Sequence, residues 1–165
     1  MVLRWWYGIA LNLLLAVLLV SGAAIAAAVV RGKQSPPQLL VLGDAVSGKV
    51  YGSWPLADGG EFAIEFIHSV NQSPVRETFK RDGKIFRPVE TRFSSFGAGM
   101  QTEPGEGEVM SRDGDFLIIT GFTRSFDELN YIVGTVSDHV LYINGGELSL
   151  RDLCGKNAHV NIHIK

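Results

Sequence analysis

Two ionisable side chains lie in apolar strand patterns, where a hydrophobic core is expected. His68 ends an alternating run that begins at Phe62, and Glu77 lies between Val75 and Phe79 in a second run. Because side chains of a strand alternate between two faces, both residues are predicted to point toward the core. A buried charge pair is costly to desolvate, so the pattern indicates either a structural network or a ligand pocket.

The two runs predict a β-hairpin whose polar loop spans residues 71–74. That loop sets the register of the two strands. It places His68 opposite Glu77 and Phe66 opposite Phe79, so that opposite charges and aromatic rings are neighbours on one face. The predicted site therefore lies across this hairpin.

Both interpretations of the His68–Glu77 pair stay open from the sequence. In the structural one, the two side chains satisfy each other inside the core. In the functional one, they form a ligand pocket with Ser69, Asn71 and Arg76 at its mouth. Replacement of both residues by apolar side chains distinguishes the two interpretations. A ligand pocket would lose binding while the domain stays folded, whereas a structural pair would have no binding to lose.

Ser137, Asp138 and His139 are the three residue types of a hydrolase triad. Contiguous residues cannot face one another as a triad must, and the sequence has no Gly-x-Ser-x-Gly elbow. A turn is the better explanation of this stretch. A hydrolase is therefore the least supported class, and the protein is expected not to be an enzyme.

Two other patterns have equally ordinary explanations. His159 and His163 lie on one strand face, but residues four apart on a strand are about 13 Å apart, too far to share one ion. A solvated strand face is favoured, and no metal or cofactor is predicted. Gly97 and Gly99 could present N–H groups to an anion, although glycines so spaced more often mark a tight turn.

Composition argues against nucleic acid as a partner and against an intramolecular disulfide. The 165 residues carry a formal net charge of −2, which gives no basic field for nucleic acid. Cys154 is the only cysteine in the sequence, so no intramolecular disulfide can form.

The first 31 residues predict a membrane anchor. Residues 5–30 contain no charged side chain, and Trp5, Trp6 and Tyr7 resemble an interfacial aromatic belt. The alternative is a signal peptide cleaved within residues 24–28, although the apolar run is long for one. We expect a single-pass protein of the cell membrane whose remaining chain lies on the extracytoplasmic, periplasmic side.

The rest of the chain predicts a linker at residues 32–38 and a β domain at residues 39–165. Short apolar runs separated by turn residues predict about nine or ten strands, and at most one helical turn at 125–130. Pro88 predicts an edge strand or a bulge. The expected fold is all-β, an antiparallel β-sandwich or a partly closed barrel, with a single N-terminal transmembrane helix.

Several of these motifs together resemble a known family. They are FIHSV at 66–70, SPV at 73–75 with Glu77 after it, FSSFGAG at 93–99, and Gly134 with His139. The sequence resembles the bacterial and archaeal family of domain of unknown function 1850. Its members look like small exported or membrane-anchored β proteins, often encoded beside tripartite ATP-independent periplasmic (TRAP) transporters of the TAXI type. The positions that the resemblance singles out are His68, Ser69, Glu77, Gly97, Gly99 and His139.

Two functional hypotheses follow. The resemblance implies an accessory protein of a TRAP solute transporter, which binds the transporter's membrane subunit or its solute-binding protein. The residues themselves indicate a module that binds a small ligand or a metal at the His68/Glu77 region.

Overall fold

The structure is a computed structural model that describes residues 38–96 and 100–165. The chain divides into two units, Met1–Pro37 and Gln38–Lys165, and the fold described below is that of the second. The predicted anchor, nearly all of the predicted linker, and Gly97 and Gly99 lie outside the described residues. In the part that is described, no helix has the length and apolar character that a membrane crossing needs.

The described unit is built of antiparallel strands, which confirms the all-β prediction. The strands and the one short helix are β1 (Leu39–Asp44), β2 (Val50–Pro55), β3 (Glu61–Ile67), β4 (Pro74–Asp82), β5 (Ile85–Phe93), β6 (Val109–Asp113), β7 (Phe116–Thr120), β8 (Glu128–Ile132), β9 (His139–Ile143), β10 (Gly146–Ser149), α2 (Leu150–Cys154) and β11 (His159–Ile164).

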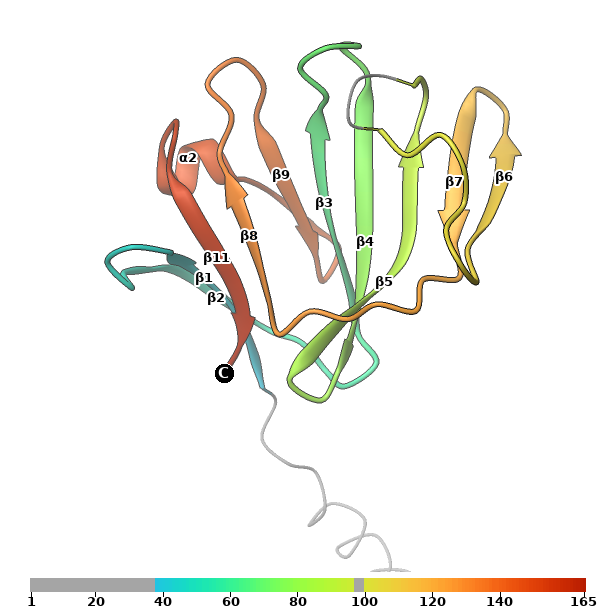
Figure 1. The fold of residues 1–165 in the computed structure, drawn as a ribbon. Coiled ribbons are helices and arrows are strands. Elements are labelled where there is room, and N and C mark those ends of the chain that lie inside the picture. The colour runs from blue at the N-terminus through green and yellow to red at the C-terminus, as the bar shows by residue number, and fades with distance from the viewer. Residues whose placement is uncertain (1–37, 97–99) are drawn as a thin grey trace, which may run out of the picture. The chain divides into compact units, whose positions relative to one another are not determined.

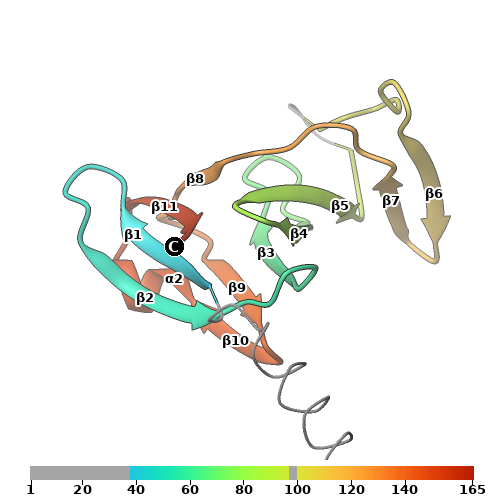
Figure 2. The same cartoon turned by 90° about the horizontal axis from the view of Figure 1, so that it is seen from below.

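The strands form two sheets that face each other as a β-sandwich (Figure 1). The four-stranded sheet has the order β2-β1-β11-β8, and the seven-stranded sheet has the order β10-β9-β3-β4-β5-β7-β6. The view from below shows the larger sheet curling until β9 and β10 lie near β2 (Figure 2). An isolated bridge between Phe86 and Phe126 joins the two sheets on the other side, so the sandwich is partly closed.

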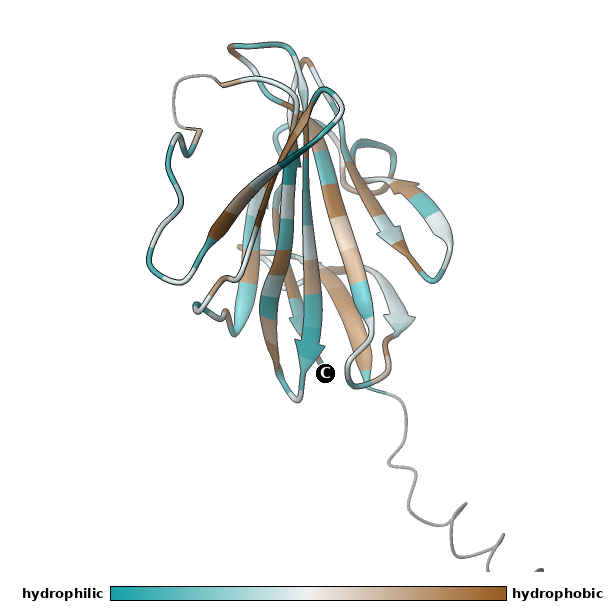
Figure 3. Ribbon diagram, turned by 90° about the vertical axis from the view of Figure 1, so that its right-hand side faces the viewer, coloured by the Kyte–Doolittle hydropathy of each residue, from teal (hydrophilic) through white to brown (hydrophobic). Residues whose placement is uncertain are grey.

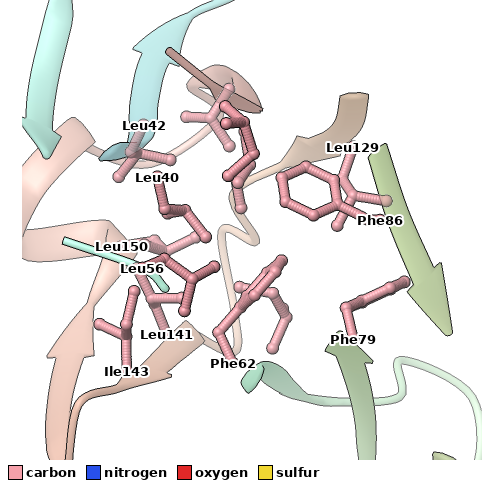
Figure 4. Close-up of a cluster of buried hydrophobic side chains, with 14 of the residues drawn as sticks. Leu40, Leu42, Leu56, Phe62, Phe79, Phe86, Leu129, Leu141, Ile143 and Leu150 are labelled. Carbon is pink, nitrogen blue, oxygen red and sulfur yellow. The ribbon is translucent and has the colours of Figure 1, made fainter. Parts of the chain in front are cut away.

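The main hydrophobic core lies between the sheets. Leu40 and Ile162 of the small sheet and Ile64 and Leu141 of the large sheet are 0 % exposed. Leucine and phenylalanine side chains from both sheets converge there (Figure 4). Apolar and polar residues alternate along many strands, as a sandwich with a solvated outer face requires (Figure 3).

The hairpin of β3 and β4 has a different register from the one predicted. Phe79 lies opposite Phe62, not Phe66, and Phe66 lies opposite Val75. The predicted loop was too short, because residues 68–73 all lie between the strands and Gln72 takes a left-handed φ of 51°. The shift is by an even number of residues, so each side chain that lies within β3 or β4 keeps its predicted face, whereas His68 lies in the loop. The predicted Phe66–Phe79 pair is wrong, and Phe79 stacks instead on Phe62 with the ring centroids 5.5 Å apart.

Three further elements differ from expectation. β5 is an internal strand and not an edge, although the expected bulge does lie at Pro88, where the β4–β5 register shifts between Thr78 and Phe79. β8 begins at Glu128, inside the stretch expected to form at most one helical turn. The helix α2 was not predicted, and Ser149 caps it by accepting a hydrogen bond from Asp152 N–H at 3.0 Å.

Candidate functional site

The predicted His68–Glu77 pair does not form. β3 ends at Ile67, so His68 lies in the following loop, where its Nδ1 accepts a hydrogen bond from the Val70 N–H at 3.3 Å. Glu77 lies opposite Ile64 in the β3–β4 ladder. The pair prediction is wrong because it depended on the shorter loop.

Glu77 has a partner from the other sheet. It points from β4 toward the small sheet, and Tyr131 of β8 donates a hydrogen bond from its hydroxyl to Oε2 of Glu77 at 3.0 Å. Burial raises the pKa of Glu77, while the Tyr131 hydrogen bond and the charge of Arg124 oppose that rise. Burial and the Glu77 carboxylate both raise the pKa of Tyr131, so the phenol stays protonated and acts as the donor.

His139 packs on the other side of Tyr131. Its ring stacks on Phe66 with centroids 5.1 Å apart and lies 5.9 Å from the Tyr131 ring. Its Nδ1 accepts a hydrogen bond from the Gly134 N–H at 3.3 Å, which places the proton of the neutral ring on Nε2. Burial lowers the pKa of His139, so the neutral form is favoured. Tyr131 therefore links Glu77 and His139, two of the residues singled out from the sequence.

A cleft of about 380 Å³ opens beside the Glu77–Tyr131 hydrogen bond. Its walls are apolar where Phe79, Phe126 and Leu129 line it, and its polar groups include Glu77 and Arg124. A hollow of this size, lined by apolar and polar side chains in similar measure, can hold a small ligand. The carboxyl group of Glu77 is the one that carries a raised pKa, which marks it as the chemical centre of the cleft.

Arg124 is held at the margin of this cleft by weak contacts. Its guanidinium lies 3.8 Å from a carboxylate oxygen of Glu108 and 4.8 Å from the centre of the Phe122 ring. The arginine side chain is 53 % exposed, which weakens both contacts, whereas the Glu108 side chain is only 8 % exposed. Arg124 contributes a nearby positive charge to Glu77 without an ion pair between the two.

The remaining predicted residues lie elsewhere. Arg76 points to the opposite face of the sheet from Glu77, 3.7 Å from Glu65 and over the ring of Tyr142, so its place at the pocket mouth is a wrong prediction. Ser69 and Asn71 belong to the loop after β3. The Ser69 carbonyl accepts a hydrogen bond from Gln72, and the Asn71 amide donates one to the Ser95 carbonyl at 2.7 Å.

Two larger hollows, of about 430 and 480 Å³, lie on that opposite face of the large sheet and share Arg76. Their arginines already have carboxylate partners, because Arg76 contacts Glu65 and Arg92 lies 3.1 Å from Asp113. We favour the smaller cleft as the site, since the half-buried Glu77 carboxyl accepts a hydrogen bond from Tyr131 alone among the described residues, whereas the surface arginines are already paired.

The cleft lies within a stretch of the chain that matches a known protein family. Residues 62–150, more than half of the chain, match the family model described as a domain of unknown function, DUF1850. The chain belongs to the DUF1850 family. No curated protein and no solved structure gave a match.

The DUF1850 segment contains the whole candidate site. It runs from β3 to the start of α2 and includes Glu77, Arg124, Tyr131 and His139. β1, β2 and β11 lie outside it, although they supply most of the small sheet. The family segment thus holds β8, the strand of the small sheet that faces Glu77.

The three triad-like residues of the DUF1850 segment have separate partners. Ser137 Oγ donates to the Ile67 carbonyl at 3.0 Å, and Asp138 accepts hydrogen bonds from Ser149 Oγ and from the Arg151 N–H. His139 accepts from Gly134, as described above. The three side chains therefore fix the loop between β8 and β9, which agrees with their interpretation as a turn.

The histidines of β11, beyond the DUF1850 segment, lie on the partly exposed face of the small sheet. His163 Nδ1 is 2.7 Å from Asn161 Oδ1, and Asn161 donates to Asn130 on the neighbouring strand at 3.1 Å. Among residues 38–96 and 100–165, no group of three or more His, Cys, Asp or Glu side chains could hold a metal ion.

Tyr131 and Arg124 are site residues that the sequence did not reveal. Tyr131 lies 54 positions after Glu77 and in the other sheet, so neither periodicity nor motif spacing connects them. The usable signal was chemical: a tyrosine hydroxyl that is buried needs a hydrogen-bond partner, and Glu77 was the one acid predicted on a core face.

Proposed function

We propose that the β domain is a binding module whose site is the cleft beside Glu77 and Tyr131. The observation that carries this proposal is the unequal use of the Glu77 carboxyl oxygens. Oε2 accepts from Tyr131, and among the described residues none is seen to donate to Oε1. An acid fixed in orientation and open to a cleft is prepared for an external hydrogen-bond donor.

The chemistry of the cleft selects a ligand with a donor group and an apolar body. An ammonium or amide group would donate to Oε1 of Glu77, and the apolar part would pack on Phe79, Phe126 and Leu129. A cationic donor would also reverse the effect of burial on Glu77, because a nearby positive charge stabilises the ionised acid. We propose binding, not catalysis, as the role of this group.

A matched series of small probes tests this function. Phenethylamine, phenethyl alcohol and phenylpropionate share an aromatic body but carry a cation, a neutral hydroxyl and an anion. Thermal unfolding of the full chain in detergent is followed with each probe at saturating concentration. A ligand present at about a hundred times its Kd adds about 2.7 kcal/mol of stability, which is easily measured.

The amine is expected to stabilise the protein more than the anion does. Glu77→Gln should abolish that preference, while Glu90→Gln, a matched control on the other face of the large sheet, should retain it. The binding proposal is wrong if no probe changes the unfolding temperature, or if the Glu77 variant responds as the unchanged protein does.

We also propose that the domain works on the extracytoplasmic side of the membrane as an accessory protein of a TRAP transporter of the TAXI type. Its support is the family resemblance together with one feature of the surface. The loops at residues 68–73, 94–96 and 133–138, which we name the apical loops, gather at the end of the sandwich opposite Lys165 (Figure 1). The resemblance motifs at 66–75 and 93–99 contribute to two of them.

The apical loops present apolar side chains to solvent. Val70, Phe96 and Val136 are 64 %, 47 % and 87 % exposed. Hydrogen bonds hold the loops together, from Asn71 to the Ser95 carbonyl and from Ser137 to the Ile67 carbonyl. Exposed apolar groups on fixed loops are typical of a docking surface.

Co-purification tests the transporter proposal. The full chain should be recovered from native membranes with a transporter membrane subunit or a solute-binding protein. Val136→Ser combined with Phe96→Ser should reduce that recovery, whereas Val46→Ser, equally exposed at 87 % in the β1–β2 turn, should not. Recovery of the protein without either subunit under mild detergent would refute this role.

A further inference from the structure

Strand β8 has a free edge inside the candidate site. It is the last strand of the small sheet, and within residues 38–96 and 100–165 its one strand partner is β11. The small sheet has four strands and faces a sheet of seven, so part of the large sheet next to β8 has no strand above it. Figure 1 shows β8 standing apart from β4 and β5 above the connecting segment 121–127.

The hydrogen bonds at both ends of β8 show which backbone groups face that edge. Val133 N–H donates to the Ala158 carbonyl, on the β11 side, at 2.9 Å. Phe126 exchanges two hydrogen bonds with Phe86 of the large sheet, at 2.7 and 2.9 Å, on the opposite side. Backbone groups alternate along a strand. The N–H and C=O groups of Glu128, Asn130 and Ile132 therefore point to the free edge, as those of Phe126 do.

The cleft lies along this same edge. Residues Glu128 to Tyr131 of β8 form one wall of the 380 Å³ hollow, and Glu77, Pro88 and Thr91 of β4 and β5 form the facing wall. The Phe86–Phe126 bridge closes one end. Exposed edge strands commonly carry proline or lysine, which discourage pairing with another chain. The β8 sequence ELNYI has neither residue.

We propose that the cleft takes an extended peptide segment of a partner protein, which adds as a strand to the free edge of β8. Its backbone would pair with Glu128, Asn130 and Ile132, as Phe86 pairs with Phe126 at the end of the cleft. This proposal rests on the proposed binding function and names the ligand class.

The charges of the cleft define the side chain that such a peptide needs. Side chains of an added strand alternate between solvent and the cleft, so one of them reaches the Glu77 carboxyl. Glu77 and Glu128 are both acidic, and the cation Arg124 is already 3.8 Å from Glu108. The complementary segment has a lysine or arginine facing Glu77 and apolar residues on either side of it, against Phe79 and Leu129.

Peptides selected from a displayed library of random octapeptides against the full chain test this proposal. The selected sequences are expected to be rich in lysine or arginine between apolar residues. Asn130→Pro should weaken their binding by about fivefold or more, since it removes one free-edge N–H group. Asn130→Ala is the matched control, because it removes the side chain and keeps that N–H.

Hydrogen exchange gives a readout that does not depend on the proline variant folding. A bound peptide should slow exchange of the Glu128, Asn130 and Ile132 amides, while the Leu129 and Tyr131 amides should change little because they face β11. Selection of no peptide, or of peptides that protect other amides or ignore Asn130→Pro, would overturn the proposal. Binding of phenethylamine dependent on Glu77, without any peptide binding, would overturn this inference and leave the proposed function intact.

Discussion

The hydroxyl of Tyr131 donates a hydrogen bond to Oε2 of Glu77 at 3.0 Å, from one sheet of the sandwich to the other. Glu77 is the acid whose pKa burial raises, and Tyr131 is the donor that opposes this rise. The bond fixes the carboxyl group at the wall of the cleft. It replaces the cross-strand partner, His68, that the sequence had indicated for the same acid.

Removal of the Tyr131 hydroxyl tests how much this bond stabilises the fold. Tyr131→Phe leaves Oε2 of a partly buried carboxylate without its donor, which should lower the free energy of unfolding by about 1–3 kcal/mol. Chemical denaturation at neutral pH measures the loss. Tyr51→Phe is the matched control, since Tyr51 of β2 donates to Asp44, the last residue of β1, at 2.9 Å beside the exposed β1–β2 turn, and its effect should be smaller. Equal effects of the two variants would contradict the assigned burial of Glu77.

The pKa of Glu77 makes the stability depend on pH. An acid whose pKa is raised by folding holds more protons when folded, so its contribution to stability is present below its ordinary pKa of 4.5 and is lost as the pH rises through the raised value. Glu77→Gln mimics the protonated acid and should remove this fall. The variant is therefore expected to gain stability relative to the unchanged protein between low and neutral pH, measured by denaturation across that range. A difference that does not change with pH would show that Glu77 keeps its ordinary pKa.

His139 is expected to make the stability of the fold depend on pH in the opposite direction. Burial lowers its pKa, so the folded protein holds fewer protons on this ring than the unfolded chain does. Its contribution to stability is present above the ordinary pKa of 6.5 and is lost as the pH falls toward the lowered value. His139→Phe should remove this loss of stability below pH 6.5 and keep the stacking on Phe66. If the variant shows the same loss of stability below pH 6.5, the loss belongs to other groups.

The register of β3 and β4 can be tested by crosslinking. Ala63 lies opposite Thr78, so Ala63→Cys with Thr78→Cys should form a disulfide under mild oxidation. Ile67→Cys with Thr78→Cys matches the register expected from the sequence, and it should not crosslink because Ile67 lies opposite Pro74. Burial raises the pKa of the Cys154 thiol to about 11, which keeps it from competing. Mass spectrometry shows which double variant forms the disulfide. A crosslink in the Ile67/Thr78 variant and none in the Ala63/Thr78 variant would support the register that pairs His68 with Glu77.

The sequence predicted the faces of the strands better than their partners. Glu77 faces the core because the two-residue period of β4 places it there beside Val75 and Phe79, whatever the register. The register itself depended on the length of the loop. Gln72 in that loop adopts a left-handed conformation, which its residue type does not predict. A loop longer than expected removed His68 from the strand and from the site.

Contacts between the two sheets could not be predicted from the sequence, for a different reason. Tyr131 meets Glu77 only because β8 of the small sheet packs over β4 of the large one, and strand spacing within one hairpin carries no information about that packing. The order in which strands join two sheets depends on the burial of all of them together. Phe126 and Phe86 illustrate this, since their bridge closes the sandwich across a large separation in sequence.

The pKa of the Glu77 carboxyl group is the most direct measurement of the candidate site. Carbon-detected NMR titration of the full chain should give a value above 4.5, which should rise further in Tyr131→Phe and stay unchanged in His68→Ala. Addition of phenethylamine should lower it, because a bound cation stabilises the carboxylate. A Glu77 pKa at or below 4.5 that responds to His68 and not to Tyr131 would contradict a site built on the Glu77–Tyr131 hydrogen bond.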